Sequence, residues 1–411
     1  LASESSINPQ TRYAQDVLGR IRFAAKEEWG LAVLHNALLE AVNAMLDSLL
    51  QKTGVKRERI YEAVYAGNTT MLHLAAGVET APLGQYPYTP LLAGAEYRGA
   101  AALNISPFGR VWFPPFVSAW VGADIVSGML ALRLDEKKGV TLFIDIGTNG
   151  EMVLARDGKL AASSTAAGPA FEGMNIRCGM RAGRGAIDSF TIEGDECVFT
   201  VIGGGEAEGI CGSGLFDIAG ELARTGVVEK NGRFAGPEKT GGRLGARLLP
   251  PPEEPSPQGG ASPDTKGGKI AFYITGTVYI SQKDIRQIQL AKGAIRCGID
   301  MLLSRFGLAP SGVDAVEIAG SFGYHLRETS LLDTGLLPPE FAGKITFAGN
   351  TSLAGAAAFL LNRHFRGRMR NLAAAVETVE LADDPAFEKN FVRCLAFPDK
   401  RSGGPEGKAD A

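Results

Sequence analysis

One sequence pattern occurs twice in this chain, once near each end. Residues 63–77 have the sequence AVYAGNTTMLHLAAG and residues 345–359 have ITFAGNTSLAGAAAF, so each copy has an apolar run, the letters A-G-N-T-[ST] and an alanine-rich stretch. Because a strand, a loop and a helix are predicted in the same order both times, the repeat indicates a duplicated structural unit. We therefore expect two lobes, each with one such loop, and the two loops facing each other across a cleft.

Hydrophobic periodicity between the two copies predicts an α/β fold. Three β-type runs separated by short turns predict an antiparallel meander, and two later apolar runs end in glycine-containing turns. Ser281–Phe306 predicts a long helix with a capping box of Ser281 and Asp284, and Ser118–Leu132 predicts an apolar helix. The predicted strands of this region are Val140–Ile146, Glu151–Leu154, Leu160–Ser164, Ala315–Ala319 and Ile345–Ala348.

Composition excludes several classes of protein. The 411 residues include 42 basic and 45 acidic side chains, and the resulting charge of −3 gives no electrostatic reason to expect nucleic acid or an anionic membrane as the main partner. The chain starts without a secretory signal, and prolines, glycines and Asp124 interrupt its longest apolar stretch, so we expect a cytoplasmic protein. The five cysteines form no C-x-x-C pair, which favours reduced thiols over a zinc or iron–sulfur site.

The segment most informative about chemistry is IDIGTNGEMVL, residues 144–154. A strand would present Asp145 at its end, and the next turn would direct Gly147, Thr148 and Asn149 toward one point, as a bound phosphate requires. Asp145 is then the candidate catalytic residue, because it could hold a Mg²⁺-bound water or orient an attacking one. The alternative is a plain hairpin with a surface aspartate, since Asn-Gly is a strong hairpin signal in any strand pair.

Two further glycine-rich loops are candidates for binding a ligand. In AVEIAGSFG, residues 315–323, an apolar strand leads into a loop where an adenosine could lie against the backbone, and an ordinary strand–turn is the alternative. In GICGSGLFD, residues 209–217, the loop precedes a helix whose N-terminus could face a phosphate, and an N-cap at Ser213 is the alternative. The candidates are Gly320, Ser321, Phe322 and Gly323 for adenosine, and Gly212, Ser213 and Gly214 for phosphate.

These motifs, in this order, resemble the acetate and sugar kinase, heat-shock protein and actin superfamily, in which two RNase H-like lobes close over ATP. In this resemblance the helices at 118–132 and 350–362 are the connections between the lobes. The match narrows to the ATP-dependent reductive activators of corrinoid proteins, and it runs from about residue 8 to residue 397. It rests on NPQTRYAQDVLGRI, AGNTTMLHLAAG, FVSAWVGADIVSGML, DIGTNGEMVL, TAAGPAFEGMNIRCGM, ICGSGLFD, ISQKDIRQIQLAKGAI, AGSFG and GNTSLAGA.

The resemblance implies a function, cofactors and a partner. The partner would be a corrinoid protein of a methyltransferase or demethylase system, whose cobalt is reduced from Co(II) to Co(I) at the expense of ATP, with Mg²⁺ bound near Asp145. The electron would come from a [2Fe–2S] cluster expected only in an N-terminal domain that these residues lack. Two alternatives stay open: a small-molecule kinase of the same superfamily, and an actin-like ATP-binding scaffold.

The chain departs from the family pattern at its start. Only one D-I-G-T segment is present, and the chain begins at Leu1, so we expect a fragment whose first lobe lacks its first phosphate-motif strands. Asn68, Thr69 and Thr70 would then be the main polar groups of the first lobe on the phosphate side. We expect little ATPase activity from this piece, and a sheet edge that could pair with a second copy to give a homodimer.

The resemblance and the composition together suggest domain boundaries. Residues 1–135 would form the first RNase H-like lobe and residues 136–348 the second, with a returning helix and C-terminal segment at 349–397. Residues 235–268 are rich in Gly, Pro, Ser and charge, which predicts a mobile insertion, and residues 398–411 predict a disordered tail for the same reason.

Overall fold

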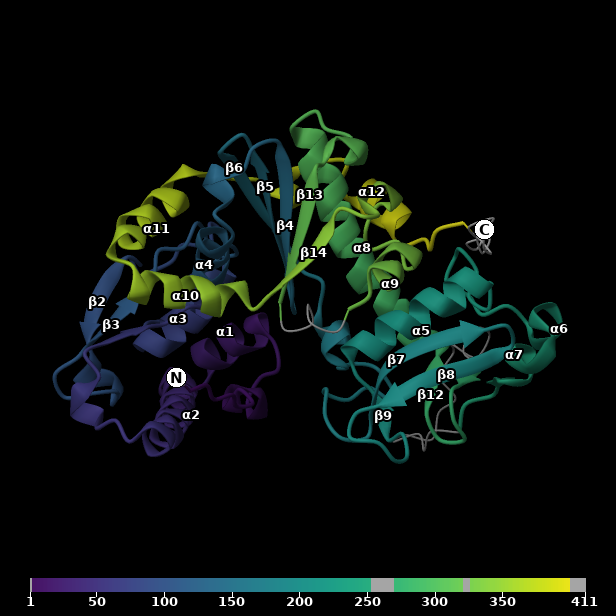
Figure 1. Ribbon diagram of the computed structural model, residues 1–411, viewed down its shortest axis with the longest axis horizontal. Helices are drawn as coiled ribbons and strands as arrows, with labels where there is room; N and C mark the ends of the chain where they lie inside the picture. The colour runs from purple at the N-terminus through teal and green to yellow at the C-terminus, as the bar shows by residue number, and fades with distance from the viewer. Residues whose placement is uncertain (1, 253–269, 321–325, 400–411) are drawn as a thin grey trace, which may run out of the picture. The chain divides into compact units, whose positions relative to one another are not determined.

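The computed structural model describes residues 2–252, 270–320 and 326–399 (Figure 1). It has the α/β fold that the periodicity predicts. Up to residue 165 the helices and strands are α1 (Val17–Lys26), α2 (Gly30–Thr53), β1 (Glu62–Val64), α3 (Thr69–Ala76), β2 (Glu96–Gly99), β3 (Arg110–Phe113), α4 (Ala123–Leu132), β4 (Val140–Ile146), β5 (Gly150–Arg156) and β6 (Lys159–Thr165). Beyond it they are β7 (Ala186–Glu193), β8 (Glu196–Val201), β9 (Gly209–Ile210), α5 (Gly212–Thr225), α6 (Pro237–Thr240), α7 (Gly242–Ala246), β10 (Leu248–Leu249), β11 (Ala271–Tyr273), β12 (Tyr279–Ser281), α8 (Gln282–Arg305), β13 (Ala315–Ala319), α9 (Glu328–Asp333), β14 (Ile345–Gly349), α10 (Thr351–Leu361), α11 (Arg363–Ala375), β15 (Val376–Thr378) and α12 (Phe387–Cys394).

The described strands form four sheets. The largest has the order β14-β13-β4-β5-β6-β15, so the three strands predicted as a meander are neighbours. The other three sheets have the orders β1-β3-β2, β10-β11-β12 and β8-β7-β9. At one edge of the largest sheet β15 pairs in parallel with β6, with Val376 opposite Leu160.

The chain divides into two compact units. Unit 1 consists of Leu1–Asp145, Glu151–Ser164 and Ala348–Val379, and unit 2 consists of Ile146–Gly150, Thr165–Phe347 and Glu380–Ala411. The units are defined by compactness, whereas the predicted lobes follow the order of the chain, so the predicted boundaries stay predictions. None of the helices in the described residues is long and apolar enough to cross a membrane.

Both copies of the repeated sequence have the predicted strand, loop and helix. In the first copy Asn68 is the N-cap of α3, and its Oδ1 accepts from the backbone N–H of Met71 at 2.9 Å. In the second copy Asn350 caps α10, and its Oδ1 accepts from the N–H of Leu353 at 2.9 Å. The shared N-cap position explains why both copies have an asparagine there, because an Asn side chain accepts from a backbone N–H at the start of a helix that has no partner within the helix. Both loops belong to unit 1, and their placement on separate lobes stays a prediction.

Helices α4 and α10 pack against each other within unit 1 and lie side by side in Figure 1. A Cβ built on Gly355 of α10 would lie only 1.9 Å from the carbonyl oxygen of Ser127 in α4. A Cβ on Gly128 of α4 would lie 2.9 Å from Thr351 Oγ1. The backbones therefore approach more closely than any side-chain-bearing residue would allow at these two points.

Helix α8 begins as the sequence predicts. Ser281 is its N-cap, the Ser281 hydroxyl accepts from the N–H of Asp284 at 3.2 Å, and Asp284 Oδ2 accepts from the N–H of Ser281 at 2.7 Å. This reciprocal pair is the predicted capping box. Asp284 also accepts from the backbone N–H of Arg177 at 2.8 Å, which ties the Gly-rich segment after η6 (Pro169–Glu172) to the start of α8.

Two predictions about secondary structure need correction. Residues 237–249 were predicted within a mobile insertion, but they form α6, α7 and β10, because Leu244 and Leu248 are buried and anchor them. Residues 253–268 of the insertion lie outside the described residues, as does the predicted tail after Asp399. The helix predicted from Ser118 begins only at Ala123, because Ser118 Oγ accepts from the N–H groups of Trp120 and Val121 and holds a turn there.

His73 is a structural residue of α3. Its Nε2 accepts from the backbone N–H groups of Leu91 and Leu92, each at 3.0 Å, so Nδ1 carries the proton and donates to Thr69 O at 2.7 Å. Burial lowers the pKa of His73 below its ordinary 6.5. The neutral ring thus joins the start of α3 to the segment near residue 91.

His73→Ala is expected to lower the free energy of unfolding by about 2–3 kcal/mol, because it leaves two backbone N–H groups, that of Leu92 buried and that of Leu91 partly buried, without an acceptor. The loss should shrink as pH falls below about 6.5, since the unfolded chain then binds a proton that the folded chain does not. Urea denaturation at pH 8 and pH 5.5 measures both effects. His364→Ala, at an exposed histidine, should change stability by less than about 0.5 kcal/mol. Equal effects of the two variants would contradict this role.

Candidate active site

Two partly buried carboxyl groups lie close enough in unit 1 for the charge of one to act on the other. Asp145 follows the fully buried Ile144 near the end of β4. Asp124 is in the first turn of α4, where its N–H donates to Gly67 O at 3.1 Å and its Oδ1 accepts from the N–H of Ile125 at 2.9 Å. A β-strand and a helix from separate parts of the sequence therefore bring one acid each to the same place.

Both acids hold their protons more strongly than usual. Burial raises the pKa of Asp124, and burial together with the charge of Asp124 raises the pKa of Asp145 to about 7. A cation between the two groups would remove the mutual repulsion and allow both to ionise. The pair is therefore suited to bind a cation.

The donor set fits Mg²⁺ bound together with a nucleotide. Among the described residues there is no group of three or more His, Cys, Asp or Glu side chains that could hold a metal alone. Mg²⁺ commonly uses one or two carboxylates and completes its octahedron with waters and substrate phosphates. Asp124 and Asp145 would hold such an ion, whose positive charge would neutralise phosphate oxygens.

The loop at Asn68 lies against the residue before α4. A Cβ on Gly122 would meet Asn68 Cα at 2.5 Å, Asp124 Oδ1 at 2.6 Å and Thr69 N at 2.9 Å. Only glycine therefore fits at position 122, and its absence of a side chain lets the repeat loop approach Asp124. The sequence predicts close packing at Gly122 from its small size, but it does not show which segment packs there, because that depends on a contact between distant segments.

The predicted first-lobe residues lie in the loop that packs against Gly122. Two of their side-chain oxygens already make hydrogen bonds within the protein. Asn68 Oδ1 caps α3, and Thr69 Oγ1 donates to Ser118 O at 2.7 Å. Thr69 and Thr70 are 0% and 2% exposed, whereas Asn68 is partly exposed. Thr69 thus holds the loop in place and Thr70 is buried beside it, and a direct phosphate contact from these three residues stays a prediction.

The turn after Asp145 is held by its own backbone and by η6. Gly147 N donates to Asn149 O at 3.0 Å, and Gly168 N donates to Thr148 O at 2.8 Å. The Thr148 hydroxyl donates to the carboxylate of Glu172. The predicted turn is therefore present, but Glu172, which the sequence did not single out, holds the Thr148 side chain. The phosphate-binding roles of Gly147, Thr148 and Asn149 stay predictions.

The third glycine-rich loop begins α5 in unit 2. The N-cap of α5 is Cys211, so the alternative of an N-cap at Ser213 is wrong. Ser213 Oγ donates to Asp188 O at 2.8 Å, and a Cβ on Gly214 would lie 2.2 Å from Ile187 O. Gly214 therefore allows the first turn of α5 to pack directly on β7, and a phosphate contact from Gly212, Ser213 or Gly214 stays a prediction.

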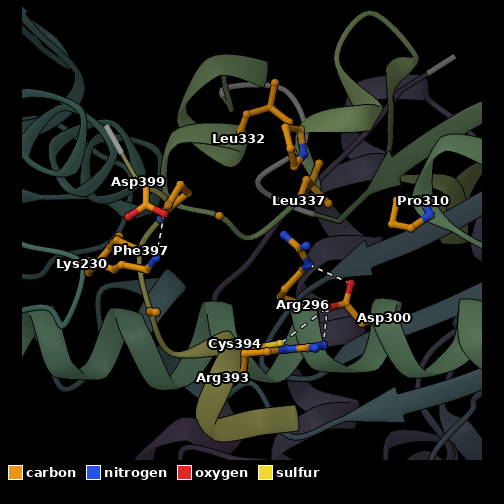
Figure 2. Close-up of a pocket in the computed structure, with 14 residues that line it drawn as sticks. Lys230, Arg296, Asp300, Pro310, Leu332, Leu337, Arg393, Cys394, Phe397 and Asp399 are labelled. Carbon is orange, nitrogen blue, oxygen red and sulfur yellow. Dashed lines mark hydrogen bonds and ion pairs between the residues drawn. The ribbon is translucent and has the colours of Figure 1, made fainter. Parts of the chain in front are cut away.

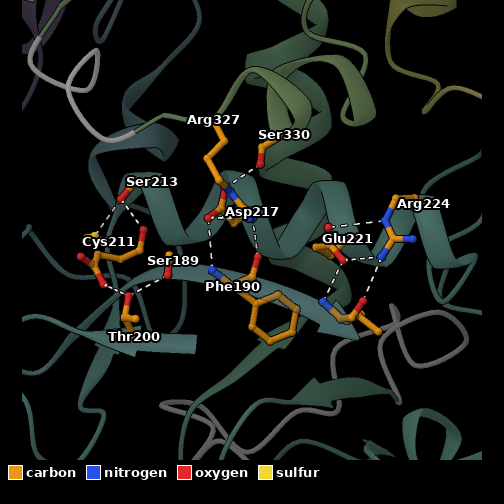
Figure 3. A network of polar contacts seen from close by, with 12 residues as sticks. Ser189, Phe190, Thr200, Cys211, Ser213, Asp217, Glu221, Arg224, Arg327 and Ser330 are labelled. Atoms are coloured by element: carbon orange, nitrogen blue, oxygen red, sulfur yellow. Dashed lines mark hydrogen bonds and ion pairs between the residues drawn. The ribbon is translucent and has the colours of Figure 1, made fainter. Parts of the chain in front are cut away.

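A polar network fixes α5 between β7 and α9 (Figure 3). Asp217 is 1% exposed; it accepts from the N–H of Phe190 at 3.1 Å and from Ser330 Oγ at 2.5 Å, and it pairs with Arg327 at 2.9 Å. Burial raises the pKa of Asp217 despite these partners. Because the acid is fully enclosed by donors, the network is a structural support and leaves Asp217 no free oxygen for chemistry.

The adenosine motif is described only at its first residue. Gly320 follows β13 and has a φ of +109°, a backbone conformation that strongly favours glycine. Ser321, Phe322 and Gly323 lie outside the described residues. Adenosine binding by the four residues stays a prediction.

Two family models together match almost the whole chain. Residues 139–405 match the C-terminal domain of RACo, the ASKHA domain, and residues 1–137 match the RACo middle region. This chain belongs to the RACo family. Membership confirms the resemblance to reductive activators of corrinoid proteins, and the ASKHA match confirms the expected actin-like ATPase fold class.

Individual RACo relatives carry names from corrinoid chemistry. The chain is 32% identical over 408 residues to corrinoid activation enzyme RamQ of Eubacterium limosum, covering 97% of this chain and 66% of that protein. It is 25% identical over 368 residues to Co(II) methylated amine-specific corrinoid protein reductase of Methanosarcina barkeri, covering 81% and 61%. A solved structure, the reductive activator for corrinoid, iron–sulfur protein, matches with a TM-score of 0.84 and 32% identity over 97% of this chain and 62% of that one. The chain therefore spans 61–66% of the length of these RACo relatives.

Proposed function

We propose that this chain is the nucleotide- and partner-binding part of an ATP-dependent activator of a corrinoid methyl-transfer protein. The activator would return the corrinoid cobalt from Co(II) to Co(I). The observation that carries the proposal is the Asp124–Asp145 pair, followed directly by a glycine-rich turn, in a chain that matches RACo from residue 1 to residue 405. The positive charge of Mg²⁺ bound with ATP would allow both carboxyl groups of this pair to ionise.

In this proposal different residues contact the metal, the phosphates and the adenosine of the bound nucleotide. Asp145 and Asp124 hold Mg²⁺ through its waters, and the turn from Gly147 to Asn149 offers backbone N–H groups to the phosphates. Gly320 and the three residues after it contact the adenosine. When bound, Mg²⁺ supplies positive charge to the phosphate oxygens.

The names of the relatives support the choice of partner. Proteins 32% and 25% identical to this chain are called an activation enzyme and a reductase of corrinoid proteins. We assign a corrinoid protein of a methyltransferase or demethylase system as the partner. The electron would come from a [2Fe–2S] cluster outside these 411 residues. The activator would work in the cytoplasm.

ATP can drive an unfavourable electron transfer only if the nucleotide changes how the activator binds its partner. We therefore expect the affinity for a Co(II) corrinoid protein of a methylated-amine methyltransferase system to differ at least tenfold between no nucleotide, Mg-ADP and a non-hydrolysable Mg-ATP analogue. Isothermal titration calorimetry measures the three affinities. The methylated Co(III) form of the same partner is the control, and it should bind more weakly in every state.

Two failures would be informative in different ways. Absence of any thermal stabilisation by Mg-ATP would contradict the nucleotide site. Stabilisation by Mg-ATP, together with no binding of Co(II) corrinoid proteins from methyltransferase or demethylase systems in any nucleotide state, would contradict the partner alone.

A further inference from the structure

Two cysteine thiols meet in unit 2 where α8 packs on α12. Cys297 lies inside α8 and is fully buried, and Cys394 is the last residue of α12 and is 6% exposed. The two thiols hydrogen-bond to each other. Cys297 Sγ also lies 3.9 Å from Phe387 O, and Cys394 Sγ lies 3.7 Å from Asp300 Oδ2. Both cysteines are free thiols.

The backbones of α8 and α12 approach each other closely at this crossing. A Cβ built on Gly293 would lie 3.3 Å from the carbonyl oxygen and 3.4 Å from the carbonyl carbon of Cys394. Gly293 and Cys297 are four residues apart on α8 and therefore share one face of the helix. This face turns Cys297 toward Cys394, and a disulfide needs such a close approach of two backbones.

The two thiols have different surroundings. Cys394 lines a cavity of about 650 Å³, together with Arg296, Asp300 and Arg393 (Figure 2), whereas Cys297 does not line it. Asp300 pairs with Arg296 at 2.9 Å and with Arg393 at 3.5 Å, so its charge is largely balanced. The hydrogen bond from Cys297, with help from the two arginines, lowers the pKa of Cys394, and the same bond raises the pKa of Cys297. Cys394 is thus the thiol that ionises and that a small molecule can reach.

We propose that Cys297 and Cys394 are a redox-active dithiol, which a small-molecule disulfide entering the cavity converts into an intramolecular disulfide. The Cys394 thiolate attacks one sulfur of the small disulfide, which forms a mixed disulfide and releases the other half as a thiol. The Cys297 sulfur then attacks Cys394, forms the internal bond and releases the second half as a thiol. The two protein thiols lose two electrons and two protons in total, and the small disulfide gains them.

The bond would fix the end of the described chain to α8. After Cys394 the chain continues to Phe397, whose ring lies 5.2 Å from Lys292 Nζ. Lys292 is 1% exposed and donates to Ala396 O. Phe397 N donates to Lys230 O at 2.9 Å. A disulfide at 297 and 394 closes the long loop between them and adds a covalent link to these contacts, so oxidation should raise the midpoint of thermal unfolding by about 3–5 °C.

The experiment uses the reduced protein and oxidised glutathione. After incubation under native conditions, free thiols are blocked with N-ethylmaleimide, and the peptides are examined by mass spectrometry. We expect a Cys297–Cys394 linked peptide that is lighter by two hydrogen atoms than the two free peptides and that dithiothreitol reverses. In Cys297→Ser, glutathione should remain on Cys394, because the resolving thiol is gone. In Cys394→Ser, Cys297 should stay unmodified. The half-buried Cys178 and Cys197 are internal controls for thiols outside this cluster.

Three results would overturn the assignment. One is a linked peptide that appears only after urea is added, because the native geometry would then not permit the bond. Another is Cys394 that is never modified in Cys297→Ser while Cys178 and Cys197 are. The third is glutathione that stays attached to Cys394 in the protein that carries neither substitution. None of these results depends on nucleotide or corrinoid protein, so they test the dithiol separately from the proposed function.

Discussion

Asp145→Asn is expected to weaken the binding of Mg-ATP at least tenfold and to leave the binding of ATP without Mg²⁺ nearly unchanged. The substitution keeps the shape of the side chain and removes the charge that would hold the ion beside Asp124. Since the carboxyl pair acts on the nucleotide through the metal, the loss should appear only when Mg²⁺ is present. Calorimetric titration of ATP with and without Mg²⁺ measures the difference.

The same variant should be more stable than the natural sequence at neutral pH when no metal is bound. The folded-state pKa of Asp145 is raised from 3.8 to about 7, so the folded protein keeps a proton that the unfolded chain releases between these values. Stability of the natural sequence therefore falls as pH rises from about 4 to about 7. The amide introduced by Asp145→Asn does not titrate, and the advantage of the variant should grow over this range to about 1–3 kcal/mol at pH 8.

Asp383→Asn is the matched control, because it removes one exposed carboxylate from another part of the chain. It should change neither the Mg²⁺ dependence of ATP binding nor the pH dependence of unfolding. If Asp145→Asn lost affinity equally with and without Mg²⁺, Asp145 would contact the nucleotide directly. If its stability followed that of the natural sequence at every pH, the carboxyl pair would not be the origin of the effect.

Local signals predicted most of the fold, because each depends on a few neighbouring residues. The capping box at Ser281, the strand at Ala315–Ala319 and the strand–loop–helix order of the two repeats follow from residues that are close together in the sequence. Asp145 at the end of β4 followed from an apolar run that stops at a turn. The insertion was misjudged, because composition over 34 residues concealed the buried leucines at 244 and 248.

The sequence could not predict contacts between distant segments. The interaction of Asp124 with Asp145 depends on α4 starting beside the end of β4, which no local sequence pattern indicates. Glu172 holds Thr148 across 24 residues, and nothing in its local sequence distinguishes it from a surface acid. Gly122 has an ordinary negative φ in a loop, and only its distance to Asn68 shows why no side chain fits.

Gly355→Ala is expected to destabilise the protein by about 3–5 kcal/mol, the largest effect of any methyl group added to unit 1. The added Cβ would overlap the carbonyl oxygen of Ser127 at 1.9 Å, and backbone cannot rotate away as a flexible side chain can. The next atoms, Ser127 C and Cα, are at 2.5 and 2.8 Å, so α4 and α10 would have to separate along the crossing. Separation would loosen α4, whose first turn carries Asp124.

Gly367→Ala is the control that separates packing from helix propensity. Gly367 lies inside α11, also in unit 1, and a Cβ built there would meet nothing within 4 Å. Alanine is the better helix former by about 1 kcal/mol at both positions, so Gly367→Ala should stabilise the protein by roughly that amount. Gly355→Ala gains the same propensity and should still lose several kcal/mol, because the clash exceeds it. Opposite signs in urea denaturation are the expected result; a stabilising or neutral Gly355→Ala would show that α4 and α10 do not cross as closely as their glycines indicate.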